Sequence, residues 1–227
     1  MPLYTWLNLA IIFFPLALSF DRRVAYWRSW PAVALAIIAA GSLFIGWDIL
    51  VTRDGHWSFD PLLAGDLRIL GLPSGEILFF FAMPFACLFI LEVARGYLQE
   101  KVYHIPMLPL MIAAALAATG AVLARDRGYT FIVLVSLGLT LILIAGPARR
   151  LFSRRTTIVA ILLSFLPFLI FNGLFTALPI VRYAPAMILG PRVITIPLED
   201  FAYSFSLIAL AMMVYDFFGF LRIGGRR

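Results

Sequence analysis

The sequence contains few of the residues from which metal centres, disulfides and cofactor attachment sites are built. It has a single cysteine, Cys87, which excludes an internal disulfide and a thiolate cluster, and only two histidines. Its only lysine, Lys101, lies between apolar runs, which excludes a retinal Schiff base in the last of them. There is no glycine-rich phosphate loop and no aspartate-rich diphosphate site. We therefore expect no metal and no cofactor.

Charged residues are also scarce, at 13% of the chain against about 25% in soluble proteins. Hydrophobic residues make up 63%, and the mean hydropathy is +1.00. The net charge of +6 does not indicate a nucleic-acid partner, because the basic residues lie in short loops between apolar runs. Seven apolar stretches are long enough to cross a bilayer, at 3–20, 31–50, 76–98, 106–124, 129–146, 157–178 and 201–221. The predicted fold class is an all-α integral membrane protein of about seven transmembrane helices, in contact with membrane lipid.

Residues 124 positions apart match along the chain, which indicates an internal repeat. The shift pairs Asp48 with Asn172, Pro73 with Pro197, Glu76 with Asp200, Phe81 with Phe205, and Glu92 with Asp216. It predicts two parallel three-helix repeats, 1–105 and 128–227, joined by a connecting helix at 106–127 within one membrane domain. Parallel repeats related by an axis along the membrane normal put equivalent positions at one depth. The two acidic motifs are therefore expected to face each other.

Polar groups at the ends of apolar segments are the main candidates for catalysis, because such groups are costly in lipid unless paired or hydrated. A simpler explanation is that the acidic residues only start a helix, as carboxylates and proline commonly do. The repeat argues against capping alone. Crowded carboxyls that are poorly solvated hold their protons, so one of them can act as an acid and protonate an alkene. The candidates are Glu76, Glu199, Asp200, Asp48 and Asn172.

Two long connections, 51–75 and 179–196, adjoin the acidic motifs and contain aromatic and charged residues. Such aromatics commonly form an interfacial belt, but over paired acids we expect a lid and substrate contacts. Aromatic faces also stabilise cations. The expected substrate-binding residues are Trp57, Phe79, Phe80, Arg182, Tyr183, Phe201 and Tyr203. By contrast, Glu92 and Asp216 are expected to pair with Arg95 and Arg222 as a structural clamp.

Eight segments resemble the membrane-embedded lycopene cyclases, which occur as heterodimeric subunits in some actinobacteria and as one fused chain in archaea, other bacteria and fungal bifunctional enzymes. The segments are 20–24, 47–52, 57–59, 72–80 and 91–93 in the first half, and 171–176, 180–183 and 196–200 in the second. The resemblance covers nearly the whole chain. The family's acidic motif, Pro-x-Glu followed by Glu or Asp, is intact at Pro197, Glu199 and Asp200. In the first copy, Gly75 replaces the first glutamate and leaves Glu76 alone.

The resemblance implies an isomerase of carotenoid biosynthesis, a lycopene β-cyclase that closes β-ionone rings at the ends of lycopene without redox change. It implies a location in a prokaryotic cell membrane, and it is compatible with a homo-oligomer or with association with other carotenoid enzymes. Two alternatives stay open. One is a non-catalytic carotenoid- or lipid-binding membrane protein of the same fold, which Gly75 suggests, and the other is a cyclase of another isoprenoid polyene.

The basic residues are distributed unevenly between alternate loops. One set of loops and the C-terminal tail hold twelve: Arg22, Arg23, Arg28, Arg95, Lys101, Arg149, Arg150, Arg154, Arg155, Arg222, Arg226 and Arg227. The other loops hold six: Arg53, Arg68, Arg125, Arg127, Arg182 and Arg192. The positive-inside rule therefore predicts an external N-terminus and a cytoplasmic C-terminus.

Cysteines introduced one at a time at Trp57, Arg182, Lys101 and Arg150 test this orientation. A membrane-impermeant thiol reagent applied to intact cells is expected to label the first two positions and to leave the last two unlabelled, because the basic loops stay inside. Labelling at Lys101 would reverse the orientation.

Overall fold

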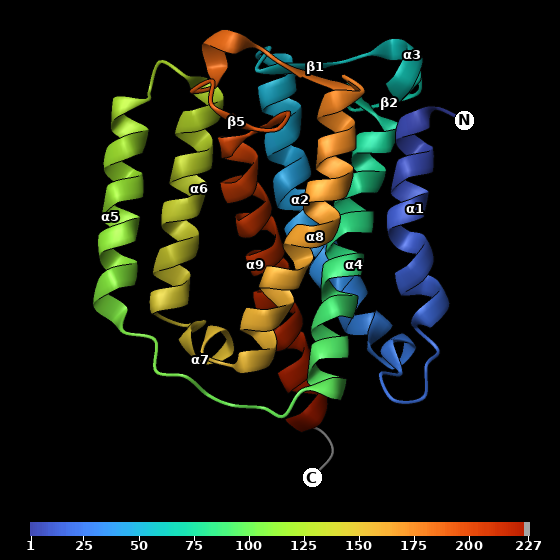
Figure 1. The fold of residues 1–227 in the computed structure, drawn as a ribbon, viewed down its shortest axis with the longest axis vertical. Coiled ribbons are helices and arrows are strands. Elements are labelled where there is room, and N and C mark those ends of the chain that lie inside the picture. The colour runs from blue at the N-terminus through green and yellow to red at the C-terminus, as the bar shows by residue number, and fades with distance from the viewer. Residues whose placement is uncertain (225–227) are drawn as a thin grey trace.

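The computed structural model describes residues 1–224, and side chains as far as residue 219. Arg226 and Arg227 of the basic tail, and the side chain of Arg222, lie outside the described residues. Figure 1 shows the long helices running side by side, with the short strands gathered at one end. The long helices are α1 (Leu3–Leu18), α2 (Trp30–Arg53), α4 (Ser74–Tyr97), α5 (Met107–Leu123), α6 (Gly128–Ala145), α8 (Arg155–Ala177) and α9 (Leu198–Gly224).

The structure is that of a mostly helical membrane protein, with helix ends within three residues of those predicted. Within the described residues, five helices are long and apolar enough to cross a membrane, namely α2, α4, α6, α8 and α9. Helices α1 and α5 are apolar as predicted but shorter, with 16 and 17 residues. Helix α9 begins at Leu198 and not at Phe201, so Glu199 and Asp200 belong to its first turn.

Short elements that the sequence analysis did not predict connect the long helices. At the end with the N-terminus lie β1 (Trp57–Phe59), α3 (Pro61–Ala64), β2 (Arg68–Ile69), β3 (Leu72–Pro73), β4 (Val181–Tyr183), η2 (Pro185–Met187), β5 (Arg192–Val193) and β6 (Ile196–Pro197) (Figure 1). At the opposite end lie η1 (Tyr26–Ser29) and α7 (Arg149–Phe152). Both long connections are therefore folded over the end of the bundle.

The short strands recur at the interval found in the sequence. Hairpin β2–β3 and hairpin β5–β6 occupy positions 124 residues apart, and so do β1 and β4. The hairpin turns contain Leu70 at φ 53° and Ile194 at φ 59°, which is a left-handed conformation that side chains with a Cβ rarely adopt. Strands β1 and β4 pair antiparallel, with Ser58 opposite Arg182 at the centre of the register. Each strand thus pairs with its own equivalent, as a local two-fold axis requires.

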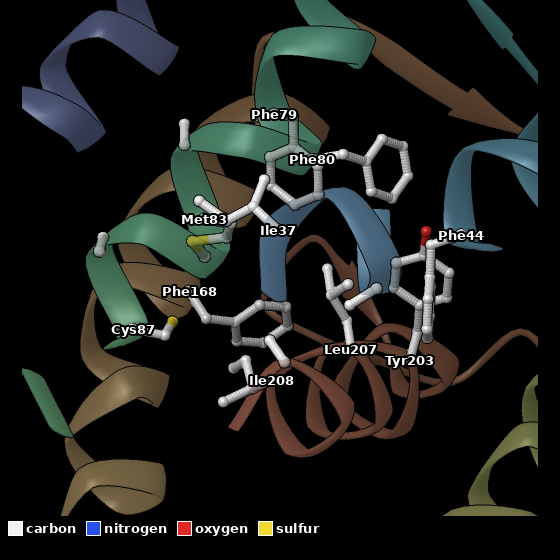
Figure 2. Packing of buried hydrophobic residues seen from close by; sticks show 14 of the residues in the cluster. Ile37, Phe44, Phe79, Phe80, Met83, Cys87, Phe168, Tyr203, Leu207 and Ile208 are labelled. Carbon is white, nitrogen blue, oxygen red and sulfur yellow. The ribbon is translucent and has the colours of Figure 1, made fainter. Parts of the chain in front are cut away.

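The core lies where the middle helix of each half packs against the last helix of the other half. Helix α2 packs on α9, and α8 packs on α4. Figure 2 shows side chains from these four helices meeting in one cluster, among them Ile37, Met83, Phe168 and Leu207. The two halves are therefore interlocked. Within the first half, α2 approaches α4 closely at Gly41, whose Cβ position is 3.4 Å from the Phe80 carbonyl oxygen.

Near the opposite end of the bundle, Arg95 joins the last helices of the two halves. Its guanidinium donates to Glu92 on its own helix at 3.0 Å and to Asp216 on α9 at 2.9 Å. Arg154 also approaches Asp216, at 3.5 Å. The clamp expected from the sequence is thus present for Arg95, while the side chain of Arg222 is outside the described residues.

Replacing Arg95 by Gln is expected to destabilise the protein, because two partly buried carboxylates lose charge-assisted hydrogen bonds worth about 1.5–3 kcal/mol each. The thermal midpoint in detergent should fall by several degrees, at roughly 2–4 °C per kcal/mol. Arg53→Gln is the matched control, since the Arg53–Asp54 pair is solvent-exposed and should contribute little. Equal midpoints for the two variants would contradict the clamp.

Candidate functional site

Two carboxyl groups from the first turns of α4 and α9 line one cavity between the halves. Glu76 and Asp200 are both buried, and they follow Pro73 and Pro197, which end the two short hairpins. The cavity has a volume of about 40 Å³, and its remaining walls are mostly aromatic. The walls comprise Tyr4, Trp57, Phe59, Phe79, Tyr129, Asn172, Phe175, Val181, Tyr183, Tyr203 and Ser204. The prediction that the two acidic motifs converge on a common cavity is confirmed.

Asp200 accepts hydrogen bonds from three side chains on three different elements. The hydroxyl of Tyr129 on α6 donates to Oδ1 at 2.6 Å. On the other oxygen, Oδ2, the amide of Asn172 on α8 donates at 2.8 Å and the hydroxyl of Tyr183 on β4 donates at 2.7 Å. Three donors can hold this carboxylate in one orientation without solvent.

Glu76 has a sparser set of partners. The hydroxyl of Tyr4 on α1 donates to its Oε2. Asp48 on α2 is the equivalent of Asn172 and is buried, but both of its carboxyl oxygens lack a hydrogen-bond partner among the described residues. Asp48 also does not line the cavity, whereas its equivalent Asn172 does.

Glu199 points away from the cavity, although it precedes Asp200 directly. Its Oε1 accepts from the hydroxyl of Thr130 at 2.6 Å and from the backbone N–H of Leu189 at 2.6 Å. Successive residues of an α-helix are about 100° apart around its axis, so two adjacent carboxyls cannot both face one point. Glu199 thus ties α6 and the connection before α9 to the first turn of α9.

Trp57, Tyr129 and Tyr183 form an aromatic layer that lines the cavity at the strand end of the bundle. Trp57 and Tyr183 face each other across the β1–β4 pair, and Trp57 also contacts Tyr129 edge-on at a ring distance of 4.9 Å. The indole N–H of Trp57 donates to Thr52 at 2.8 Å. Burial, and next the nearby Asp200 carboxylate, raise the pKa of Tyr183 well above its usual value near 10. The Tyr183 hydroxyl is therefore a hydrogen-bond donor and not an ionised base.

The expected substrate contacts divide into two groups. Trp57, Phe79, Tyr183 and Tyr203 line the cavity. Three others do not line it. Phe80 is fully buried in the core, and Phe201 packs against Phe165 and Phe168 of α8. Arg182 on β4 forms an ion pair with Asp60 at 2.6 Å.

Sequence analysis missed two of the three tyrosines that donate to the acids, Tyr4 and Tyr129. They are 125 residues apart and occupy the same place in the first helix of each half. The internal repeat could have revealed them, because it continues through the first helices at an interval of 125 residues in place of 124. A tyrosine near the end of an apolar run is otherwise typical of the membrane interface.

Gly75, the departure from the acidic motif, is explained by Tyr4. A Cβ at position 75 would lie 2.7 Å from Cδ1 and 2.8 Å from Cγ of the Tyr4 ring. The carbonyl of Gly75 also accepts from the Asn8 side chain at 2.9 Å. A glutamate cannot fit at this position while Tyr4 donates to Glu76, so the glycine is part of how α1 docks.

The side chains that line the cavity include two carboxyl groups, which suit acid–base chemistry better than metal binding. No group of three or more His, Cys, Asp or Glu side chains within residues 1–219 is arranged to hold a metal. A volume of about 40 Å³ is far below the roughly 300–1,000 Å³ of typical ligand pockets. A ligand larger than a few atoms therefore has to displace wall side chains.

Comparison with known proteins identifies one related family. The family model described as lycopene cyclase matches the chain over residues 1–94 and 126–218. The two matched stretches start 125 residues apart and end 124 residues apart, in agreement with the interval between equivalent elements. Searches of curated proteins and of solved structures found no match.

Gly75→Ala tests the fit between α1 and α4. The added methyl group has to push the Tyr4 ring from its place, which breaks the Tyr4–Glu76 hydrogen bond and costs about 1–3 kcal/mol through overpacking. The thermal midpoint in detergent should fall. Gly46→Ala on α2 is the control, because nothing lies within 4 Å of its Cβ position. A midpoint for Gly75→Ala equal to that of Gly46→Ala would contradict the packing.

Proposed function

We propose that the chain, which belongs to the lycopene cyclase family, is a lycopene β-cyclase that converts the linear ends of lycopene into β-ionone rings. The observation that carries the proposal is the meeting of Glu76 and Asp200 in one small cavity whose other walls are mostly aromatic. Ring closure needs a proton at one end of a terminal isoprene unit and a base close to the resulting cation. A pair of carboxyls in an apolar cavity provides both.

The reaction follows from this pair without any change of oxidation state. A carboxylic acid transfers its proton to the terminal double bond, and a C–H bond forms. The neighbouring double bond attacks the tertiary cation, which forms the ring C–C bond and moves the positive charge into the ring. A carboxylate then removes a ring proton, and the electron pair left behind becomes the ring double bond.

The cavity walls support the cationic intermediate. The faces of Tyr203 and Phe79, which occupy equivalent positions on α9 and α4, attract positive charge without reacting with it. The layer made by Trp57, Tyr129 and Tyr183 limits the entry of water, which would capture the cation as an alcohol. Because the cavity is small, binding of a polyene end requires these side chains to move apart.

The architecture that fits this function is a pair of parallel three-helix repeats, α1–α2–α4 and α6–α8–α9, with α5 as the connecting helix. Its support is the recurrence of the strands at 124 residues, the antiparallel pairing of β1 with β4, and the two stretches matched by the family model. With the N-terminus outside, the acidic cavity lies near the outer face of a prokaryotic cell membrane. Lycopene then enters from the lipid, as the substrate of a monomer, a homo-oligomer or an assembly with other carotenoid enzymes.

Expression in cells that accumulate lycopene tests the function directly. Pigment analysis is expected to find γ- or β-carotene, whereas a binding protein would leave lycopene unchanged and a cyclase of another polyene would act on that compound alone. Asp200→Asn and Glu76→Gln should each slow formation of β-carotene by on the order of 100-fold or more, because the amides cannot transfer a proton. Glu199→Gln should be less damaging, since Glu199 lies outside the cavity wall.

Glu92→Gln is the control for the loss of a carboxyl, because Glu92 pairs with Arg95 far from the cavity. It should change stability and leave the pigment composition as in the parent. Parental rates in Asp200→Asn and Glu76→Gln together would exclude the carboxyl mechanism.

A further inference from the structure

The two carboxyls of the cavity are held differently, although they occupy equivalent positions 124 residues apart. Asp200 accepts from Tyr129, Tyr183 and Asn172. Glu76 accepts from Tyr4 alone among the described side chains. The equivalents of two donors are thus missing around Glu76, because Phe59 stands at the position of Tyr183 and Asp48 at the position of Asn172.

Asn172 and Asp48 occupy equivalent positions, but a carboxamide can donate a hydrogen bond where an ionised carboxylate cannot. An amide nitrogen can only donate, so Asn172 supplies a proton to the Asp200 carboxylate. An ionised aspartate can only accept, so Asp48, at the position equivalent to Asn172, can form no such bond with Glu76 unless a proton lies on one of them. Asp48 is 1% exposed, and both of its oxygens lack a partner among the described residues.

We propose that the two halves divide the acid and the base between them. Asp48 and Glu76 hold one proton in common, Glu76 delivers it to the substrate, and Asp200 stays ionised and removes the ring proton. This inference rests on the proposed function for the delivery and removal steps, but the protonation of the pair stands on its own. Asp48 is a positioning residue in this scheme, because it acts through Glu76 and does not line the cavity.

The physical reason is the cost of a buried charge without donors. Two neighbouring carboxylates in a poorly solvated site repel each other and lack solvation, so they retain a proton that belongs to the pair. The opposite holds at Asp200, where three charge-assisted hydrogen bonds compensate one negative charge. That fixed charge also lies beside the position where the ring cation forms and stabilises it.

The proton balance closes within the cavity. Glu76 loses its proton to the terminal alkene, and Asp200 gains a proton when the ring double bond forms. The proton then returns from Asp200 to the Asp48–Glu76 pair before the second end reacts. Tyr183 hydrogen-bonds to Asp200 and lines the same cavity as Glu76, so its hydroxyl is suited to relay this return.

Infrared spectroscopy of the purified, lipid-reconstituted protein at neutral pH tests the shared proton. A protonated carboxyl has a C=O stretching band that an ionised one lacks. Relative to the wild type, Asp48→Asn and Glu76→Gln are each expected to lose one such band, since the amide introduced by Asp48→Asn can donate to Glu76 as Asn172 does to Asp200. Asp200→Asn and the control Glu92→Gln are expected to lose none. Loss of a band in Asp200→Asn, or retention of every band in both Asp48→Asn and Glu76→Gln, would overturn the inference.

Turnover of lycopene in D₂O separates the acid from the base. Asp200→Asn retains the acid and is expected to transfer deuterium to lycopene, with the ring double bond formed at another position or the cation captured by water. Glu76→Gln is expected to transfer no deuterium. Deuterium uptake by Glu76→Gln with none by Asp200→Asn would overturn the division of roles. A wild type that leaves lycopene unchanged would instead refute the proposed function, and the infrared result would still decide where the proton lies.

Discussion

Carboxyl groups buried away from water need hydrogen-bond donors, and much of the helix arrangement follows from supplying them. Asp200 brings α6, α8 and β4 to the first turn of α9, through Tyr129, Asn172 and Tyr183. Glu76 brings α1 to α4 through Tyr4. Helix α1 otherwise exposes large apolar side chains such as Phe13 and Phe14, so its polar contacts near the cavity fix how it docks. The same contacts that hold the peripheral helices therefore orient the two acids.

The sequence predicted the helices and the convergence of the acids, because both leave periodic signals. Apolar runs locate helix ends to within three residues, and one interval relates Glu76 to Asp200. The folded connections were missed, since strands of two or three residues are too short for an alternating pattern. Glu199 was expected in the site, but the helical rotation between neighbours turns its carboxyl toward Thr130 on α6 and away from the cavity. The effect of Gly75 was invisible in the sequence, because it depends on a ring that comes from α1.

The helices that carry the two acids each pack against a helix of the opposite half. Helix α2 packs on α9 and α8 on α4, so each acid sits on a helix that is braced by the opposite half. The strand pair β1–β4 repeats this exchange above the cavity. Close packing, as at Gly41 between α2 and α4, accompanies the small volume of the acidic cavity. Side chains of the aromatic layer are then the elements whose movement admits a substrate.

The pairing of each strand with its own equivalent also bears on how such a chain can diverge. A homodimer made of one half would meet the same geometric conditions, but any change at position 48 would appear at both acids at once. Fusion of two copies into a single polypeptide removes this constraint, so one copy can keep a carboxyl where the other has a carboxamide. The two acids of this chain thus lie in different surroundings, although one interval relates the helices that carry them.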